Sequence, residues 1–414
     1  MGDERSVRFA EAFRHQEFRA LFGAYTISTA GDQFARVALS VLVFDRTGSP
    51  AWTALTYALT FVPDLVGGPL LTGLADRYPR RGVMVGADVL RTALVAVMAL
   101  PGLPLPWVAA LLVIVALAGS PANAARGAVL PSLVPDEVYP IGQAALSSSG
   151  QLAQVAGFAG GGALIAAIGT SGVLWADAAT FAASALLIRF GIRVRAAAAT
   201  ETGVVRRGWW SDLVSGAALV WRTRTLRALV GFACISGIYI AGEALAAPYA
   251  AELGGAALLV GFLFAGYALG AALGMVILAR APAGRRLAAM PVLAVLSCAP
   301  LLLCALRPGA VGVVVLFVVS GLASSYQVTA STTFVQGVPN DRRGQAFGLA
   351  VTSLKVSQGV GVAAAGIAAE WFTPHAVVAA AGLLGVAAAI GVGVLWRKAV
   401  TAPAVSDSRP AAAP

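Results

Sequence analysis

Between two long apolar runs, the sequence reads Gly73-Leu74-Ala75-Asp76-Arg77-Tyr78-Pro79-Arg80-Arg81. Each flanking run is about 20 residues or longer, the length of helix that crosses a bilayer. A turn that holds glycine, proline and three arginines at this point predicts a tight loop at a membrane surface. Lysine and arginine are enriched in cytoplasmic loops, so the stretch also predicts on which side of the membrane this loop lies.

Composition supports a membrane protein along the whole chain. Of the 414 residues, 58% are hydrophobic and 12% are charged, and the mean hydropathy is +0.82, whereas a soluble domain has roughly 25% charged residues. The net charge of +10 does not indicate nucleic-acid binding, because the basic residues cluster in short loops between apolar runs. The three cysteines lie in apolar segments without metal-ligand spacing, so we expect no metal site and no cofactor.

In lipid every backbone polar group must be paired internally, so such apolar runs must be helices. We predict an all-α polytopic protein with twelve transmembrane helices at residues 18–44, 51–74, 83–101, 105–126, 139–168, 170–191, 228–250, 256–279, 287–306, 309–335, 345–370 and 375–396. Arginines gather at both chain ends and in every second loop, whereas the alternate loops hold only Arg46 and Arg307. This pattern predicts that both termini are cytoplasmic. The lysine-poor, Ala- and Arg-rich composition indicates a GC-rich bacterium and hence its inner membrane.

The chain divides into two similar halves. Residues 192–224 form the longest interruption, so we expect an N-terminal six-helix bundle, a cytoplasmic linker and a C-terminal six-helix bundle at 1–191, 192–224 and 225–400, with a disordered tail at 401–414. Phe18–Gly23 recurs as Leu226–Gly231, and Val134-Pro135 recurs as Val338-Pro339 at nearly the same offset. Parallel six-plus-six repeats imply an axis along the membrane normal and a substrate site between the halves near mid-membrane.

Several stretches resemble one transporter family. Residues 73–81 are similar to the signature Gly-x-Leu-Ala-Asp-Arg-x-Gly-Arg-Arg of the major facilitator superfamily, with Pro79 where glycine is usual. Residues 157–162, Gly-Phe-Ala-Gly-Gly-Gly, resemble the antiporter-associated motif of that superfamily, with Phe158 replacing proline. Residues 31–33 and 44–50 resemble its macrolide-efflux and enterobactin-exporter branch. The resemblance covers nearly the whole chain, and it implies the major facilitator fold, alternating access and efflux.

Charged residues inside the predicted spans are candidates for function, because a charge at the bilayer centre costs at least about 2.5–3.5 kcal/mol. Asp32 lies near the middle of the first span, and Arg36 lies one turn further on the same face. In one interpretation Asp32 takes up a proton, while Arg36 tunes the proton affinity of Asp32 or binds an anionic substrate. In the other, the two residues form a permanent ion pair. Glu243 has no basic residue within a turn of it. It is therefore a proton or substrate candidate, with an outer gate as the alternative.

Other polar residues in the predicted spans are weaker candidates for a functional role. Asp64 follows Pro63 and is a candidate for proton coupling, for lining the cavity or for a gate hinge. Lys355 is expected to pair with an acid across the cavity or to snorkel, and Asp177 is expected to face the scaffold. Six polar residues either contact an amphipathic substrate or form helix–helix hydrogen bonds worth under about 2 kcal/mol each. These cavity candidates are Gln151, Gln154, Tyr267, Tyr326, Gln327 and Gln358.

The resemblance also suggests a gate at the cytoplasmic mouth. A charge network there would hold that side closed in one state and break in the other, or its arginines would only set topology. Its expected members are Gly73, Asp76, Arg77, Arg80, Arg81, Asp88 and Arg91. The matching loop of the second half, residues 280–286, keeps two arginines but lacks the aspartate, so we expect an asymmetric gate.

These observations favour a secondary active transporter that works as a monomer. We expect proton-coupled efflux of a small amphipathic compound, such as a drug, antibiotic or siderophore, with the bilayer and protons as partners. The alternatives are an uptake facilitator or symporter, and a membrane sensor or scaffold that transports nothing. An enzyme is not expected, because His15 and His375 stand isolated in the sequence and no phosphate-binding Gly-x-x-x-x-Gly-Lys-[Ser/Thr] run is present.

Overall fold

The apolar stretches fold into helices, and the described residues contain no strand. The computed structural model describes residues 9–61, 77–195, 209–339 and 342–401. The first group of helices comprises α1 (Phe9–Ala12), α2 (Gln16–Thr47), α3 (Pro50–Leu59), α6 (Arg80–Met98), α7 (Leu105–Val129), η1 (Leu130–Ser132) and α8 (Tyr139–Gly191). The all-α prediction is confirmed.

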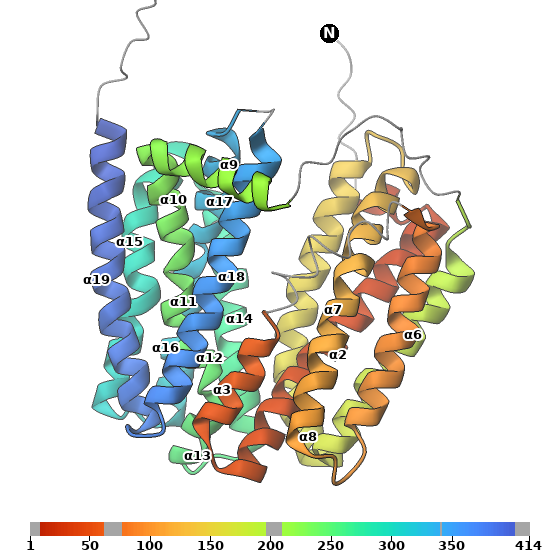
Figure 1. Cartoon of the computed structure of the whole chain (residues 1–414), viewed down its shortest axis with the longest axis horizontal. Coiled ribbons are helices and arrows are strands. Elements are labelled where there is room, and N and C mark those ends of the chain that lie inside the picture. Colours follow the sequence, from red (N-terminus) through yellow and green to blue (C-terminus); the bar gives the residue numbers. More distant parts are fainter. Residues whose placement is uncertain (1–8, 62–76, 196–208, 340–341, 402–414) are drawn as a thin grey trace, which may run out of the picture.

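The second group follows the segment where a linker is predicted. It comprises α9 (Trp209–Arg222), α10 (Arg224–Cys234), α11 (Ser236–Tyr239), α12 (Ala241–Ala244), α13 (Ala246–Glu252), α14 (Ala257–Ala279), α15 (Ala283–Leu302), η2 (Leu303–Leu306), α16 (Ala310–Ser324), α17 (Tyr326–Gln336), α18 (Arg343–Ala368) and α19 (Pro374–Thr401). Figure 1 shows the two groups side by side, with α9 lying across the upper end of the second. We call the end where α2 begins and α19 finishes the termini face, and the opposite end the distal face.

Eight helical segments of the described residues are long and apolar enough to cross a membrane. One of them, α8, has 53 residues and contains a break at Gly169, whose φ of 71° is natural for a residue without a side chain. The break lies between the predicted spans 139–168 and 170–191. Helices α2 and α6 carry internal charges, which lower their hydropathy. Residues 62–76 lie outside the described part, so the number of twelve spans stays a prediction.

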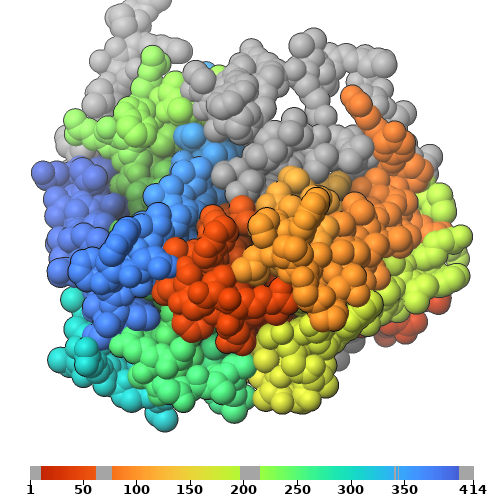
Figure 2. Space-filling view, turned by 60° about the horizontal axis from the view of Figure 1, so that its bottom comes forward, coloured from red at the N-terminus to blue at the C-terminus, as the bar shows by residue number. Residues whose placement is uncertain are grey.

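The two groups meet where glycines let helices approach closely. A side chain on Gly162 of α8 would place its first carbon 2.8 Å from the Ala257 carbonyl oxygen, and one on Gly261 of α14 would lie 2.9 Å from the Gly162 Cα. On the other side, Gly366 of α18 packs against Ala54 of α3. Figure 2 shows these segments in contact, red against blue and green against yellow, on the side turned toward the distal face. Small residues at these crossings give the close packing typical of membrane helices.

Candidate functional site

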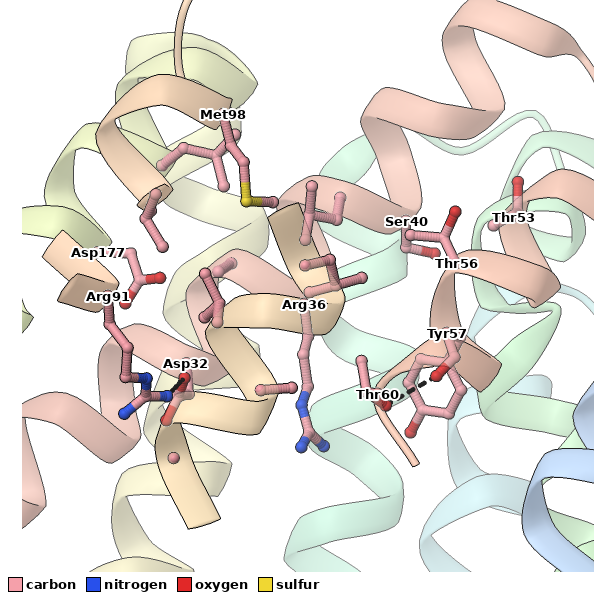
Figure 3. A pocket seen from close by; sticks show the side chains of 18 of the residues that line it. Asp32, Arg36, Ser40, Thr53, Thr56, Tyr57, Thr60, Arg91, Met98 and Asp177 are labelled. Carbon is pink, nitrogen blue, oxygen red and sulfur yellow. Dashed lines mark hydrogen bonds and ion pairs between the residues drawn. The ribbon is translucent and has the colours of Figure 1, made fainter. Parts of the chain in front are cut away.

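A cavity of about 190 Å³ lies inside the first group, lined by α2, α3, α6, α7 and α8. Its charged lining residues are Asp32, Arg36, Arg91 and Asp177 (Figure 3). Drug-sized ligands occupy pockets of roughly 300–1,000 Å³. In the present conformation this cavity therefore accommodates a small group or one part of a larger substrate.

Asp32 pairs with Arg91, not with Arg36. The Arg91 Nη2 atom lies 2.7 Å from Asp32 Oδ1, and its guanidinium stacks 3.8 Å above the centre of the Phe181 ring. In Figure 3 the Arg36 side chain points away from Asp32 toward another part of the cavity. The alternative of an Asp32–Arg36 ion pair is therefore wrong, because a neighbour on α6 offers Asp32 a closer cation than its own helix does.

Asp88 belongs to the same buried group. It is 3% exposed, accepts a hydrogen bond of 2.6 Å from the Ser184 hydroxyl, and lies 4.0 Å from Arg91. We expected Asp88 and Arg91 in a network at the membrane surface, but both are inside the first group. At a rise of about 1.5 Å per residue, they stand roughly 12 and 16 Å along α6 from its start at Arg80.

Asp177 adds a third carboxylate to this cluster. It is 1% exposed and lines the cavity, so the expectation that it faces the scaffold is wrong. The Thr180 hydroxyl donates to the Asp177 carbonyl at 2.7 Å and lies 3.3 Å from its carboxylate. A side chain on Gly31 would collide with Thr180 and Asp177. The glycine before Asp32 thus lets α2 approach α8 and brings the two acids to one cavity.

Glu243 links the two groups. The Tyr57 hydroxyl of α3 donates a hydrogen bond of 2.6 Å to Glu243 Oε2 of α12, and Arg36 of α2 lies close enough to act electrostatically on both. Sequence reasoning missed Tyr57. A sequence signal was available. Hydroxyl-bearing side chains recur at the spacing of one helical face, at Thr53, Thr56, Tyr57 and Thr60 (Figure 3).

The remaining polar candidates serve mainly as contacts between helices. The Tyr326 hydroxyl donates to the Phe232 carbonyl at 2.9 Å, and Gln327 donates to the same carbonyl at 3.3 Å. Gln151 approaches the Met275 sulfur at 3.8 Å. The other three are Gln358, which lies 3.4 Å from the Ser236 hydroxyl, Tyr267, whose ring centre lies 6.0 Å from that of Tyr239, and half-buried Gln154. None of the six lines the cavity of the first group.

Lys355 also reaches across the groups. Its ammonium lies 5.3 Å from the centre of the Phe61 ring, just after α3. That distance suits a cation–π contact. Together with the Tyr57–Glu243 bond, it ties the second group to α3 and the turn that follows it.

Only part of the predicted gate lies within the residues that the structure describes. Arg80 donates to the Ala128 carbonyl at 2.7 Å, Arg81 donates to the Arg189 carbonyl, and Arg77 is exposed. These contacts join the start of α6 to the ends of α7 and α8 within the first group. Asp64, Gly73 and Asp76 lie outside the described residues, so their roles stay predictions.

His375 is not isolated, contrary to the sequence-based expectation. Its Nδ1 contacts the Glu252 carboxylate, and the Arg307 Nε donates to its Nε2 at 3.1 Å. Arginine has no acceptor, so this geometry assigns the proton to Nδ1. In the described part of the chain, no group of three His, Cys, Asp or Glu side chains is placed to hold a metal ion.

A latch at the distal face joins Glu370, just after α18, to the start of α3. Glu370 Oε1 accepts a hydrogen bond from the Ser49 hydroxyl and a second, of 3.0 Å, from the Ala51 backbone N–H. Ser49 is the N-cap of α3. A carboxylate of the second group therefore caps a helix of the first, where negative charge is favoured. The hydrogen bonds from Ser49 and Ala51 lower the pKa of Glu370.

This latch predicts acid-sensitive closure of the distal face. A carboxyl whose pKa is lowered by the closed state stabilises that state above its ordinary pKa and loses the effect as pH falls through the lowered value. We therefore expect closure to be intact at neutral pH and to weaken below about pH 4. Distances between spin labels at exposed Trp52 and Ile367 would report it. Glu370→Gln should remove this pH response, whereas Asp45→Asn, at an exposed acid of the same face, should keep it.

Comparisons with known proteins agree with this architecture. The family model described as Major Facilitator Superfamily matches the chain twice, over residues 21–244 and 227–414. The multidrug efflux pump Tap of Mycobacterium tuberculosis is 31% identical over 231 residues, which cover 52% of this chain and 53% of Tap. Macrolide efflux protein A of Streptococcus pyogenes is 27% identical over 125 residues, covering 29% of this chain and 31% of that protein. The chain thus aligns with about half of the length of Tap and with a smaller part of macrolide efflux protein A.

A solved structure supports the fold over nearly the whole chain. A bacterial homolog of the human lysosomal transporter Spinster, in an inward-facing conformation, superposes with a TM-score of 0.66 over 96% of both chains at 15% identity. The first family match covers the first group from α2 onward and continues to α12, and the second match covers the second group from α10 onward. This protein therefore belongs to the Major Facilitator Superfamily, and it is a multi-pass membrane transporter.

Proposed function

We propose that this transporter exports a small amphipathic compound in exchange for protons, by alternating access. The observation that carries the proposal is the buried hydrogen bond between Tyr57 and Glu243, which joins the two groups at 2.6 Å. An acid at this junction couples protonation to the contact between groups. The similarity of the chain to the multidrug efflux pump Tap and to macrolide efflux protein A favours export.

Charge at Glu243 sets the strength of this junction. An ionised carboxylate accepts a stronger hydrogen bond from Tyr57 than a neutral one does, and it attracts Arg36. Tyr239 and Tyr267 of the second group lie close enough to interact electrostatically with Glu243, while Lys355 of α18 stacks on Phe61. A proton that binds Glu243 weakens the Tyr57 bond and frees Arg36. The groups then separate at the distal face.

In this proposal, the charged cluster around Asp32 binds the substrate. Asp32 and Asp177 line the cavity, and the Arg91 guanidinium neutralises Asp32. The Arg91 Nε atom is buried without a hydrogen-bond partner in the described part of the chain. Because that donor is unsatisfied, the Asp32–Arg91 pair gains from a polar group that enters the cavity. We propose that the substrate places a polar group there and its apolar body between the two groups.

We propose that the termini face is cytoplasmic and that the membrane is the bacterial inner membrane. The arginine distribution supports this orientation. The distal face would then be periplasmic, and the contacts between Glu370 and α3 would close the outer mouth. The described structure corresponds to an inward-facing state in this proposal. The transporter would function as a monomer, since each chain holds both repeats.

Transport in proteoliposomes tests the proposal against its rivals. The purified chain would be reconstituted with an imposed pH gradient and offered a macrolide antibiotic and an amphipathic dye. We expect uptake into vesicles in which the termini face points outward when the lumen is acidic, and its loss when a protonophore collapses the gradient. Flux that ignores the gradient would indicate a facilitator, and movement of substrate together with protons would indicate a symporter. Absence of flux for every compound would favour the sensor or scaffold.

A further inference from the structure

A recess of about 570 Å³ opens on the termini face of the first group, away from the substrate cavity. The start of α2, the start of α6 and the end of α8 form its walls. The charged residues among its lining are Glu17, Arg81, Arg189 and Arg193. Three arginines against one glutamate make the recess electropositive, which favours an anionic ligand.

The positive charge of the recess is not cancelled internally. Glu17 is engaged by Arg195, whose Nη1 lies 2.6 Å from its carboxylate, whereas Arg193 is 3.8 Å away and 90% exposed. In the described residues, the contact of the Arg189 guanidinium is with the Phe190 ring, 5.8 Å from its centre. Arg189 and Arg193 are therefore available to a ligand without breaking an established close ion pair.

An apolar strip runs from this recess along the outer surface of α8. Leu186 is 57% exposed and Phe190, one turn later, is 79% exposed. Both lie in the last two turns of a helix that crosses the membrane. A free phosphate ion would use the arginines alone, whereas a phospholipid would use the arginines with its headgroup and the strip with an acyl chain.

We propose that this recess is a binding site for one anionic phospholipid, whose phosphodiester headgroup contacts Arg189 and Arg193 while an acyl chain lies along Leu186 and Phe190. The ligand would bridge the ends of α2, α6 and α8. Basic pockets at the membrane surface bind such headgroups because the cytoplasmic leaflet is anionic. This site includes none of the cavity residues, and its one lining residue from the predicted gate, Arg81, bonds the backbone of residue 189 and is not a proposed headgroup contact.

Binding of phosphatidylglycerol to the purified full chain in mild detergent, followed by native mass spectrometry, tests the site. Each arginine near an anionic surface contributes roughly fivefold in affinity, so R189Q/R193Q should bind phosphatidylglycerol about 25-fold more weakly. R189K/R193K should restore most of the binding, and phosphatidylcholine should bind weakly to every form. The control R280Q/R285Q removes two exposed arginines from the same face of the second group and should bind as the unmodified chain does.

Three results would overturn the proposal. Equal losses in R189Q/R193Q and R280Q/R285Q would mean diffuse attraction to the basic face. Inorganic phosphate that displaces phosphatidylglycerol at equal concentration would mean a site for free anions. Phosphatidylcholine binding as tight as phosphatidylglycerol binding would mean that the strip, not the arginines, holds the lipid. Both arginine side chains are exposed, and Arg81 bonds the backbone of residue 189, so the variants retain the contacts that the fold needs.

Discussion

Glu243→Gln is expected to abolish transport driven by a pH gradient. Glutamine has nearly the same shape and still accepts a hydrogen bond from Tyr57, but it takes up no proton at physiological pH. A hydrogen bond to a charged partner is worth about 1 kcal/mol more than one between neutral groups, or roughly fivefold in the equilibrium between the joined and separated groups. The variant should therefore bind substrate, favour separation of the distal ends, and carry no coupled flux.

Proteoliposome flux and proton counterflow, measured together, check this prediction. Tyr57→Phe removes the donor but leaves the acid, so it should weaken the closed distal face while keeping some proton counterflow. Asp136→Asn, at an exposed loop acid, serves as the control and should behave as the unmodified chain. Proton-coupled export by Glu243→Gln at the normal rate would contradict the coupling role of Glu243.

Arg91→Met is expected to destabilise the protein by about 3 kcal/mol, because removing one partner of a buried ion pair leaves uncompensated charge. Arg91 has a side chain that is 10% exposed, while that of Asp32 is 36% exposed, which places the loss at the lower end for buried pairs. Methionine keeps most of the volume, and the lost interactions are the ion pairs with Asp32 and Asp88 and the stack on Phe181. The variant should unfold at a lower temperature.

Thermal unfolding of the purified variants in detergent measures this effect. The double variant Arg91→Met with Asp32→Asn should recover part of the loss, since it removes both charges of the closer pair and leaves only Asp88 without its cation. Arg195→Met is a matched control, because the Arg195 side chain is 37% exposed, against 10% for Arg91, and its pair with Glu17 should contribute less than about 1 kcal/mol. A midpoint for Arg91→Met equal to that of the control would show that the buried pair is not needed for stability.

Local sequence rules succeed for the helices and fail for the ion pairs. The spacing of Asp32 and Arg36 on one helix suggested that they pair, but Arg91, 59 positions away, takes that place. The same rules placed Asp88 beside the surface arginines of residues 77–81, although a helix that starts at Arg80 carries position 88 two turns inward. Glu243 was identified as a candidate from its isolation in an apolar run. Its partner Tyr57 lies 186 residues away in the sequence and was not identified as a candidate.

The sequence by itself determined that this protein is an all-α membrane transporter of two repeats in the Major Facilitator Superfamily. Those properties are local: a helix in lipid pairs its own backbone, so run length and loop charge are readable without knowing its neighbours. Only the tertiary structure decided which charges meet, because pairing depends on which helix faces cross and how closely glycines let them approach. Residues 73–81 thus predicted the family, while packing assigned Arg80 and Arg81 to helix ends and Asp32 to Arg91.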